Sequence, residues 1–218
     1  MKILAIFGAG GLGVETLELA RIINEKEHTW DGFVFVNNGD EVPDIEGVCV
    51  CSVEKAVEKY GDALEGIIAV GEPTVRKKIV GDFEKYSIKG ARIISPDVHI
   101  PTSTKIGEGV CICTGAYISC NVTIGDNVII SQHAIVGHDV VIDNNVIISA
   151  TCVLCGMVHV KDNSYIGPGA LVKESLTIGE GSVAAIGSVV FKDVKDGELV
   201  IGNPARASIR SGEKIFNG

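Results

Sequence analysis

The sequence is poor in aromatic residues and in positive charge. Its 218 residues include one tryptophan, six phenylalanines and four tyrosines, against 27 glycines. So few rings and so many glycines suit a thin, repetitive β-structure better than a thick globular core. The 19 basic residues are outnumbered by 28 acidic ones, which leaves a net charge of −9. This charge argues against a nucleic acid as a partner.

The sequence also predicts neither a membrane span nor an export signal. The uncharged stretch Asn144–Val160 contains Asn, Ser, Thr and Gly, and its large apolar residues recur at a fixed period, unlike a spanning helix of about 20 mainly apolar residues. We expect no signal peptide after Met1. Seven cysteines without such a signal predict reduced thiols and a cytoplasmic location. We interpret Cys152 and Cys155 as packing residues, because no second cysteine pair has the spacing of zinc ligands.

A six-residue period runs through the second half of the chain. From Ile94, every sixth residue is apolar over seventeen consecutive positions, and the residue four places further into each hexad is mostly small or β-branched. The first series is Ile94, Ile100, Ile106, Ile112, Ile118, Ile124, Ile130, Val136, Ile142, Ile148, Leu154, Val160, Ile166, Val172, Ile178, Ala184 and Val190. A helix repeats about every 3.6 residues and a strand about every 2. A period of six therefore predicts a parallel β-helix.

These hexads resemble the left-handed β-helix family, in which three hexads form one triangular coil. The resemblance implies that residues eighteen apart stack at strand spacing, about 4.8 Å. It also implies a homotrimer with active sites between neighbouring prisms. Because one coil buries little on its own, stacking and association would stabilise the prism.

We predict a small, Rossmann-like α/β domain over residues 1–90, and the β-helix with a C-terminal tail over residues 91–218. Short apolar runs in this part of the chain predict strands, and the amphipathic segment after the first run predicts a helix. Strands that alternate with helices indicate a parallel sheet. The predicted elements are strands at 2–7, 33–36 and 66–71, a helix after Gly13 and a helix over 73–86.

Gly8-x-Gly10-x-x-Gly13 stands between the first strand and the first helix, as in the dinucleotide fingerprint. However, the next strand ends in Asn37-Asn38 rather than in an acidic ribose ligand, and the domain is about half of a full dinucleotide-binding fold. We therefore favour a nucleotide-linked sugar, held by exposed amides at the helix start, over a hydride cofactor. The alternative is that the glycines only close a tight turn.

His138 is the candidate general base among the five histidines. Asp139 follows it directly, and the stacking rule places Gly156 one coil above it. A thioester reaction needs a base for the proton of the nucleophile and a donor for the developing oxyanion. His138 and the amide of Gly156 would supply them, with Asp139 orienting the imidazole. We expect His99 and His159, which both fall beside a turn, to have no acidic neighbour.

A zinc site is the rival interpretation of the same histidines. His133 and His138 copy the two-histidine spacing of the β-helical carbonic anhydrases, whose zinc is held by three histidines shared between subunits. The third ligand would fall at Asp97, because His99 is two places out of phase. A site of two histidines and one aspartate stays open as an alternative.

The motifs together resemble those of the sialic-acid and bacillosamine-type sugar acyltransferases of the NeuD/PglD group. In chain order the matching segments are 7–13, 69–72, 75–79, 136–139 and the tail 200–206, and the fit covers nearly the full length. This family joins a small α/β domain to a left-handed β-helix and uses acetyl-CoA. The resemblance therefore implies acetyl-CoA as the acyl donor.

The resemblance also implies roles for individual residues. His138 would be the general base and Asp139 the carboxylate that supports it. Backbone groups around Gly156, Pro168 and Ile186 would line the channel for the pantetheine and thioester. The residues expected to face the sugar nucleotide are Gly11, Leu12, Gly13, Asn37, Asn38 and Gly71.

Three positions depart from the family pattern, and none of them is the proposed base. Relatives commonly have a histidine where this chain has Leu12 and acidic residues where it has Asn37 and Asn38. A second histidine in the coenzyme site of some relatives corresponds here to Ile147. The nucleotide and the sugar are therefore left open.

We predict an acetyl-CoA-dependent acetyltransferase that moves an acetyl group to an amine or hydroxyl of a nucleotide-linked sugar in bacterial glycan biosynthesis. The expected partners are acetyl-CoA, the sugar or sugar nucleotide and further copies of the chain in a homotrimer, with no nucleic acid and no metal. The same base serves both nucleophiles, so N- and O-acetylation both stay open, as does a UDP-linked, CMP-linked or free acceptor. The alternatives are a zinc carbonic-anhydrase-like enzyme and a non-catalytic sugar-nucleotide-binding scaffold.

Overall fold

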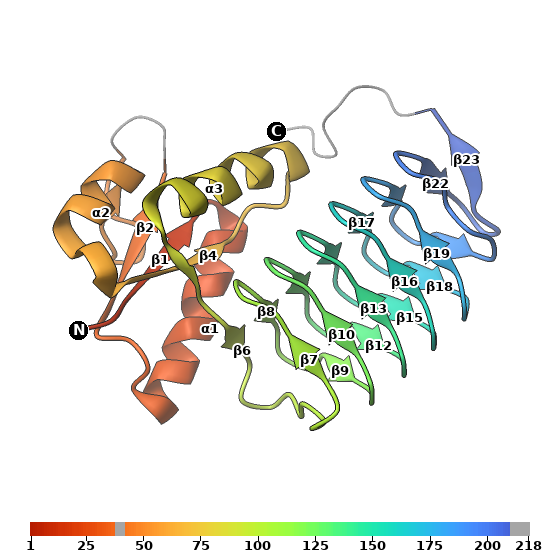
Figure 1. The fold of residues 1–218 in the computed structure, drawn as a ribbon, viewed down its shortest axis with the longest axis horizontal. Helices are drawn as coiled ribbons and strands as arrows, with labels where there is room; N and C mark the ends of the chain where they lie inside the picture. Colours follow the sequence, from red (N-terminus) through yellow and green to blue (C-terminus); the bar gives the residue numbers. More distant parts are fainter. Residues whose placement is uncertain (38–41, 210–218) are drawn as a thin grey trace. The chain divides into compact units, whose positions relative to one another are not determined.

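The computed structural model describes residues 1–37 and 42–209, and Figure 1 shows the path of the chain. Internal contacts divide it into two compact units, which meet in the sequence between Ile93 and Ile94. No helix in these described ranges is long and apolar enough to cross a bilayer.

The first unit is a five-stranded parallel sheet with helices between its strands. Its elements are β1 (Ile3–Phe7), α1 (Gly11–Glu27), β2 (Gly32–Val36), β3 (Val50–Cys51), α2 (Val53–Tyr60), a 3-10 turn (Gly61–Ala63), β4 (Leu64–Ile68), α3 (Pro73–Tyr86) and β5 (Lys89–Gly90). The strand order is β3-β2-β1-β4-β5, and β1 is buried along its whole length, as its unbroken apolar run requires. The order reverses beside β1, so a ligand crevice is expected at the carboxyl ends of β1 and β4.

Several details of this unit differ from the sequence prediction. β3 has only two residues, too few for a recognisable strand pattern, and the short helix α2 was not predicted. The predicted strand at 66–71 starts at Leu64 and ends at Ile68. It ends opposite Phe7, the last residue of β1, and beyond this point the buried guanidinium of Arg76 in α3 donates to the carbonyl oxygens of Ile68 and Val70, at 3.2 and 2.9 Å.

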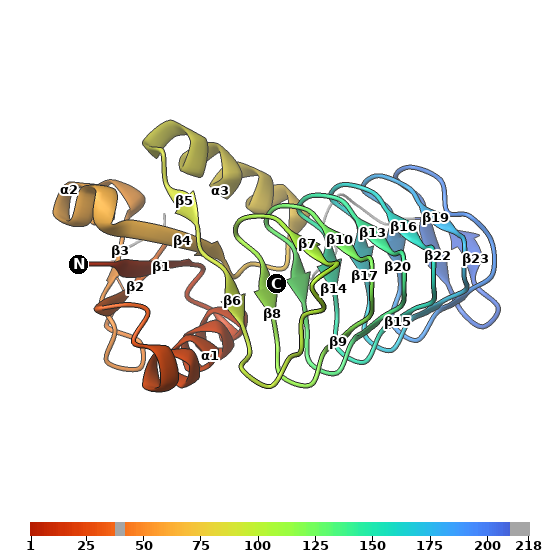
Figure 2. The same ribbon diagram turned by 60° about the horizontal axis from the view of Figure 1, so that its bottom comes forward.

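The second unit is a three-sided prism of short strands (Figure 2), parallel except for the last strand, with one strand to each hexad except the hexad of Ile100. The β10 sheet contains β7 (Lys105–Ile106), β10 (Thr123–Ile124), β13 (Val141–Ile142), β16 (His159–Val160) and β19 (Thr177–Ile178). The β11 sheet contains β6 (Ile93–Ile94), β8 (Cys111–Ile112), β11 (Ile129–Ile130), β14 (Ile147–Ile148), β17 (Tyr165–Ile166), β20 (Val183–Ala184), β22 (Leu199–Ile201) and β23 (Arg206–Ser208). The β12 sheet contains β9 (Tyr117–Ile118), β12 (Ile135–Val136), β15 (Val153–Leu154), β18 (Leu171–Val172) and β21 (Val189–Val190).

Strands pair with the strands eighteen residues away, as the repeat predicts. Ile124 lies opposite Ile142 in the β10 sheet, and Val136 lies opposite Leu154 in the β12 sheet. The step shortens in the last coil, where Ala184 pairs with Val200. The predicted fold class, a Rossmann-like α/β domain followed by a left-handed parallel β-helix, is confirmed.

The hexad positions form one continuous core along the prism. Ile112, Ile130, Ile148 and Ile166 are all completely buried, and burying a side chain of this size stabilises the fold by about 1.5–3 kcal/mol. From Gly109 to Gly187, each corner between sheets places one residue in the left-handed region, and most of these residues are asparagine, aspartate or glycine. These residue types adopt that backbone conformation at the least cost, which explains how the chain turns so tightly after every strand.

Candidate active site

His138 and Asp139 lie in the turn that leads from β12 to β13. The corresponding turns of the neighbouring coils hold Cys120 below and Gly156 above, and we name this edge of the prism, defined by Cys120, His138 and Gly156, the His138 corner. Backbone bonds keep the coils in register here: the Asp139 N–H donates to the Cys120 carbonyl at 3.0 Å, and the Met157 N–H to the His138 carbonyl at 2.8 Å. The position of His138 is therefore fixed by rigid coils on both sides.

The two side chains of the turn form a hydrogen-bonded pair. His138 Nδ1 lies 2.8 Å from Asp139 Oδ2, so Nδ1–H donates and the lone pair of Nε2 is left for a substrate proton. Asp139 Oδ1 accepts a second bond from Asn121 Nδ2 at 3.1 Å. The bond from His138 first, and that from Asn121 second, lower the pKa of Asp139 below its ordinary value. The carboxylate therefore stays charged beside the imidazole.

Gly156 provides the space that the imidazole occupies. A Cβ at position 156 would lie 2.5 Å from His138 Nε2 and 2.6 Å from Cε1, distances that real contacts do not reach. The carbonyl of Gly156 accepts from the Ser175 N–H at 3.0 Å, whereas its own N–H has no hydrogen-bond partner among the described residues. A base and a free amide donor therefore lie together, as acyl transfer requires.

The other two predicted coenzyme residues lie on a different edge of the prism. Pro168 and Ile186 occupy the turns from the β11 sheet to the β12 sheet, and we name the edge formed by His133, Pro168 and Ile186 the Pro168 corner. The two turns stack on each other, and the Gly187 N–H donates to the Pro168 carbonyl oxygen at 2.9 Å. The Ile186 side chain is 72% exposed. Within one chain, the structure does not bring them to His138.

The zinc alternative is split between the same two edges. His133 lies on the Pro168 corner, above Gly115, where an added Cβ would be 2.3 Å from His133 Nδ1. The carboxylate of Asp97 is already engaged, by the Gly115 N–H at 2.8 Å and by the Ser95 hydroxyl, and the Ser95 bond is the main cause of its lowered pKa. Within the described ranges no three His, Cys, Asp or Glu residues are grouped so as to hold a metal ion.

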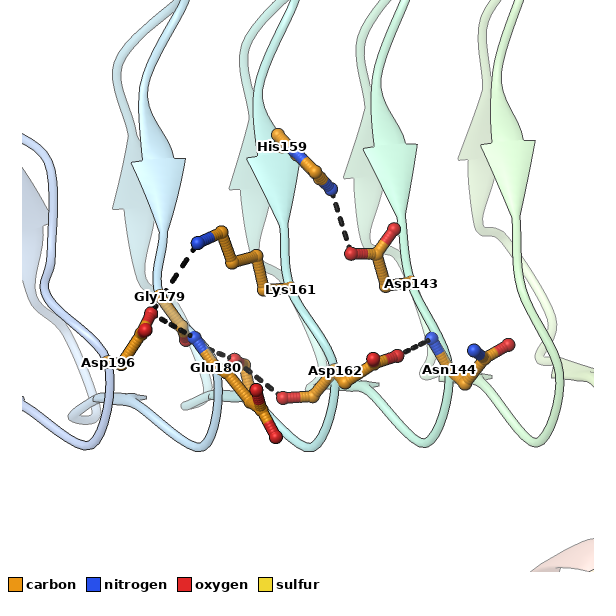
Figure 3. A network of polar contacts seen from close by, with 9 residues as sticks. Asp143, Asn144, His159, Lys161, Asp162, Gly179, Glu180 and Asp196 are labelled. Carbon is orange, nitrogen blue, oxygen red and sulfur yellow. Dashed lines mark hydrogen bonds and ion pairs between the residues drawn. The ribbon is translucent and has the colours of Figure 1, made fainter.

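A second histidine–carboxylate pair lies on the outer face of the β10 sheet (Figure 3). His159 Nε2 is 2.9 Å from Asp143 Oδ2, so the expectation that His159 has no acidic neighbour was wrong. The contact joins residues sixteen apart on adjacent coils, a diagonal that a search along the chain does not find. Nearby, Lys161 pairs with Asp196 at 3.6 Å, and the Asn144 N–H donates to the Asp162 carboxylate at 2.7 Å.

In the first unit, the glycine turn opens on a cavity of about 520 Å³ at the carboxyl ends of the strands. Of the residues predicted to face a sugar nucleotide, Gly11, Leu12, Asn37 and Gly71 line it. The lining also includes residues that were not predicted: Gly8, Ala9, Gly10, Val42, Ile45, Ala69 and Val70. The reversal of strand order beside β1 could have indicated several of them, because it places a ligand crevice at the carboxyl ends of β1 and β4. Among the described residues no side chain caps the start of α1, so its first amides can face an anionic group.

Two of the predicted sugar-nucleotide residues are not among those lining the cavity. Gly13 is buried, and a Cβ there would lie 2.0 Å from the Gly8 carbonyl oxygen and 3.3 Å from the Phe35 ring. This glycine is thus needed for packing of the helix against the turn. Asn38 lies outside the described residues.

The glycine-turn cavity and the His138 corner are typical of a class of protein, the β-helical acyltransferases with an N-terminal α/β unit. Residues 3–83 match the family model of the PglD N-terminal domain. The chain is 30% identical to GDP-perosamine N-acetyltransferase of Escherichia coli O157:H7, over 99% of this chain and 100% of that one. The chain belongs to the NeuD/PglD-type family of sugar acyltransferases, as its motifs predicted.

Solved structures show the same architecture. The acetyltransferase domain of PglB from Neisseria gonorrhoeae, in complex with acetyl coenzyme A, superposes with a TM-score of 0.87 at 29% identity, covering 95% of this chain and 99% of that one. PerB from Caulobacter crescentus, in complex with CoA and GDP-perosamine, gives 0.85 at 27% identity, covering 95% and 98%. A match to serine acetyltransferase of Bacillus subtilis, 45% identical, spans only 56 residues, 26% of either chain.

Proposed function

We propose that the chain transfers an acetyl group from acetyl-CoA to an amino group of a nucleotide-linked sugar. The observation that carries this proposal is the His138 imidazole, oriented by Asp139 at 2.8 Å and seated over Gly156. Full-length relatives that are named N-acetyltransferases, and the CoA and GDP-perosamine bound by PerB, support the choice of donor and acceptor. A hydroxyl acceptor would use the same base and is the second candidate.

In the proposed reaction His138 Nε2 accepts a proton from the sugar amine as its nitrogen attacks the thioester carbonyl. The C–N bond forms, the C–S bond breaks, and the departing sulfur takes up the proton from the imidazolium, which returns His138 to its neutral form. Asp139 stabilises the transient positive charge. The Gly156 N–H would donate to the carbonyl oxygen as negative charge develops there. Acetyl-CoA, as the donor, supplies the activated acyl group and leaves as the free thiol.

The nucleotide would lie in the glycine-turn cavity. The free amides at the start of α1 suit a diphosphate, and the Asn37 side chain offers neutral hydrogen-bonding groups at the edge of the cavity. Leu12 lacks the polar group that a histidine provides at this position in relatives. Because acetyl-CoA is the donor and the cysteines are free, we place the reaction in the cytoplasm.

A homotrimer would unite the two edges that one chain keeps apart. The β12 sheet lies between the His138 corner and the Pro168 corner, and its outward residues form an apolar row. The row is Tyr117, Ile135, Val153, Leu171 and Val189, with Tyr117, Ile135 and Leu171 exposed by 59%, 43% and 42%. In a closed three-membered ring that buries this face, one protomer's His138 corner would adjoin its neighbour's Pro168 corner. A donor held in that groove would contact Gly156 of one chain and Pro168 and Ile186 of another.

The catalytic proposal is tested by CoA-thiol release from acetyl-CoA over a panel of amino-sugar nucleotides, including GDP-perosamine, with free sialic acids as the hydroxyl-bearing comparison. Turnover with an amino-sugar nucleotide is expected. Binding of acetyl-CoA without turnover on any acceptor, or stoichiometric zinc by elemental analysis, contradicts it.

Sedimentation tests the assembly: the wild type should have about three times the chain mass of 22.9 kDa, and Leu171→Asp should lower the sedimenting mass. A monomeric wild type refutes the trimer.

A further inference from the structure

Asn121 lies directly beneath Asp139 at the His138 corner, one coil nearer the N-terminus. Both residues take the left-handed position of their turns, with φ of 58° each, so their side chains leave the backbone in the same direction. The Asn121 N–H donates to Ser103 Oγ at 2.9 Å, and Asn121 Nδ2 donates to Asp139 Oδ1 at 3.1 Å. A continuous set of bonds therefore leads from Ser103 through Asn121 and Asp139 to His138.

Each carboxylate oxygen of Asp139 thus has its own donor, Asn121 for Oδ1 and His138 for Oδ2. The terminal torsion of an aspartate is broad, and the Asp139 side chain is 48% exposed, so one bond alone would leave the carboxylate free to rotate. A second bond from a neutral donor fixes the plane of the carboxylate and adds no competing charge. The direction in which Oδ2 faces the imidazole is then set by Asn121.

We propose that Asn121 is a positioning residue of the acetyl transfer: its amide fixes Asp139, and Asp139 in turn fixes the tautomer and the plane of the His138 ring. This inference rests on the proposed function, in which His138 is the general base. Asn121 touches no reacting atom in this role. Its removal should therefore lower kcat and leave the binding of acetyl-CoA intact.

Asn121→Gly removes the amide and keeps a residue that accepts positive φ. The matched control is Asn127→Gly, which changes the same left-handed position, φ 55°, at the next corner of the same coil, away from His138. With acetyl-CoA and the amino-sugar nucleotide that is turned over fastest, Asn121→Gly is expected to lose about tenfold in kcat with an unchanged KM for acetyl-CoA. Asn127→Gly is expected to keep the wild-type kcat.

Asn121→Asp separates the loss of a donor from a change of shape, because it is nearly isosteric and tolerates the same φ. Near pH 8 its carboxylate would repel that of Asp139, and kcat should fall further than in Asn121→Gly. As the pH falls toward about 6, two adjacent carboxylates come to share a proton, and the new residue becomes a donor again. The ratio of its kcat to the wild-type kcat should therefore rise as the pH falls.

Nitrogen NMR of histidine-labelled protein needs no acceptor and reads the ring directly. The neutral His138 ring should carry its proton on Nδ1 in the wild type and in Asn127→Gly, and lose part of that population in Asn121→Gly. A wild-type kcat with an unchanged tautomer in Asn121→Gly overturns the inference, as does an equal loss in both glycine variants. Failure of the proposed function is distinct, because His138→Ala would then turn over at the wild-type rate.

Discussion

An alanine at position 156 would place a methyl group where the imidazole of His138 now lies. The new Cβ would be 2.5 Å from Nε2 and 3.0 Å from Cδ2, whereas optimal contact between nonbonded heavy atoms lies at about 3.5–4.0 Å. The ring must therefore retreat by about 1 Å. Because Nδ1 is bonded to Asp139 at 2.8 Å, that movement breaks the bond or tilts the ring. A displacement of about 1 Å in a catalytic arrangement costs on the order of 10²-fold in rate.

Steady-state release of CoA measures this cost. We expect kcat of Gly156→Ala to fall about 10²-fold, with an unchanged thermal midpoint, since the φ of Gly156 lies outside the left-handed region and alanine can adopt it. Gly81→Ala in α3 is the control, because nothing lies within 4 Å of its added Cβ, and it should keep the wild-type kcat. A folded Gly156→Ala protein with wild-type kcat would refute the proposed geometry of base and amide.

Further predictions concern the core, the thiols and the carboxylate. Leu154→Ala should lower the free energy of unfolding by about 2–5 kcal/mol in urea titrations, because Leu154 is completely buried; a loss below about 1 kcal/mol would contradict the packing. Burial raises the pKa of the Cys152 thiol to about 11, so iodoacetamide near pH 8 should label exposed Cys120 and spare Cys152, and equal labelling in peptide maps would be the contrary result. Asp139→Asn should reduce kcat by about 10²–10⁴-fold while acetyl-CoA still binds; unchanged turnover would remove Asp139 from the mechanism.

The β-helix could be predicted almost residue by residue because one physical rule governs it. The hexad period fixes which residues point inward, and the step of eighteen fixes which residues stack, so Gly156 could be placed beside His138 from the sequence. The same rule places Asn121 below Asp139. However, asparagine is common in tight turns because it adopts the left-handed φ, so its presence there did not indicate that its side chain bonds to Asp139. His159 and Asp143 were missed because they meet on a diagonal, sixteen residues apart.

The first unit was predicted less completely because its contacts follow no period. The strand–turn–helix pattern located the glycine turn, yet it could not tell which glycine faces a ligand and which one packs. Gly13 is required by the Gly8 carbonyl and the Phe35 ring, two contacts that exist only once the sheet has formed. The bonds of Arg76 beyond the end of β4 likewise join it to carbonyl groups six and eight residues before it.

Two histidines of the prism are each paired with a carboxylate, and comparing their alanine variants tests whether His138 is the general base. His138 is bonded to Asp139 at 2.8 Å and lies over Gly156, while His159 is bonded to Asp143 at 2.9 Å on the outer face of the β10 sheet. In CoA-release assays at saturating acetyl-CoA, His138→Ala should lose about 10²–10⁴-fold in kcat and His159→Ala less than about twofold. Equal losses, or wild-type turnover in His138→Ala, would contradict His138 as the base.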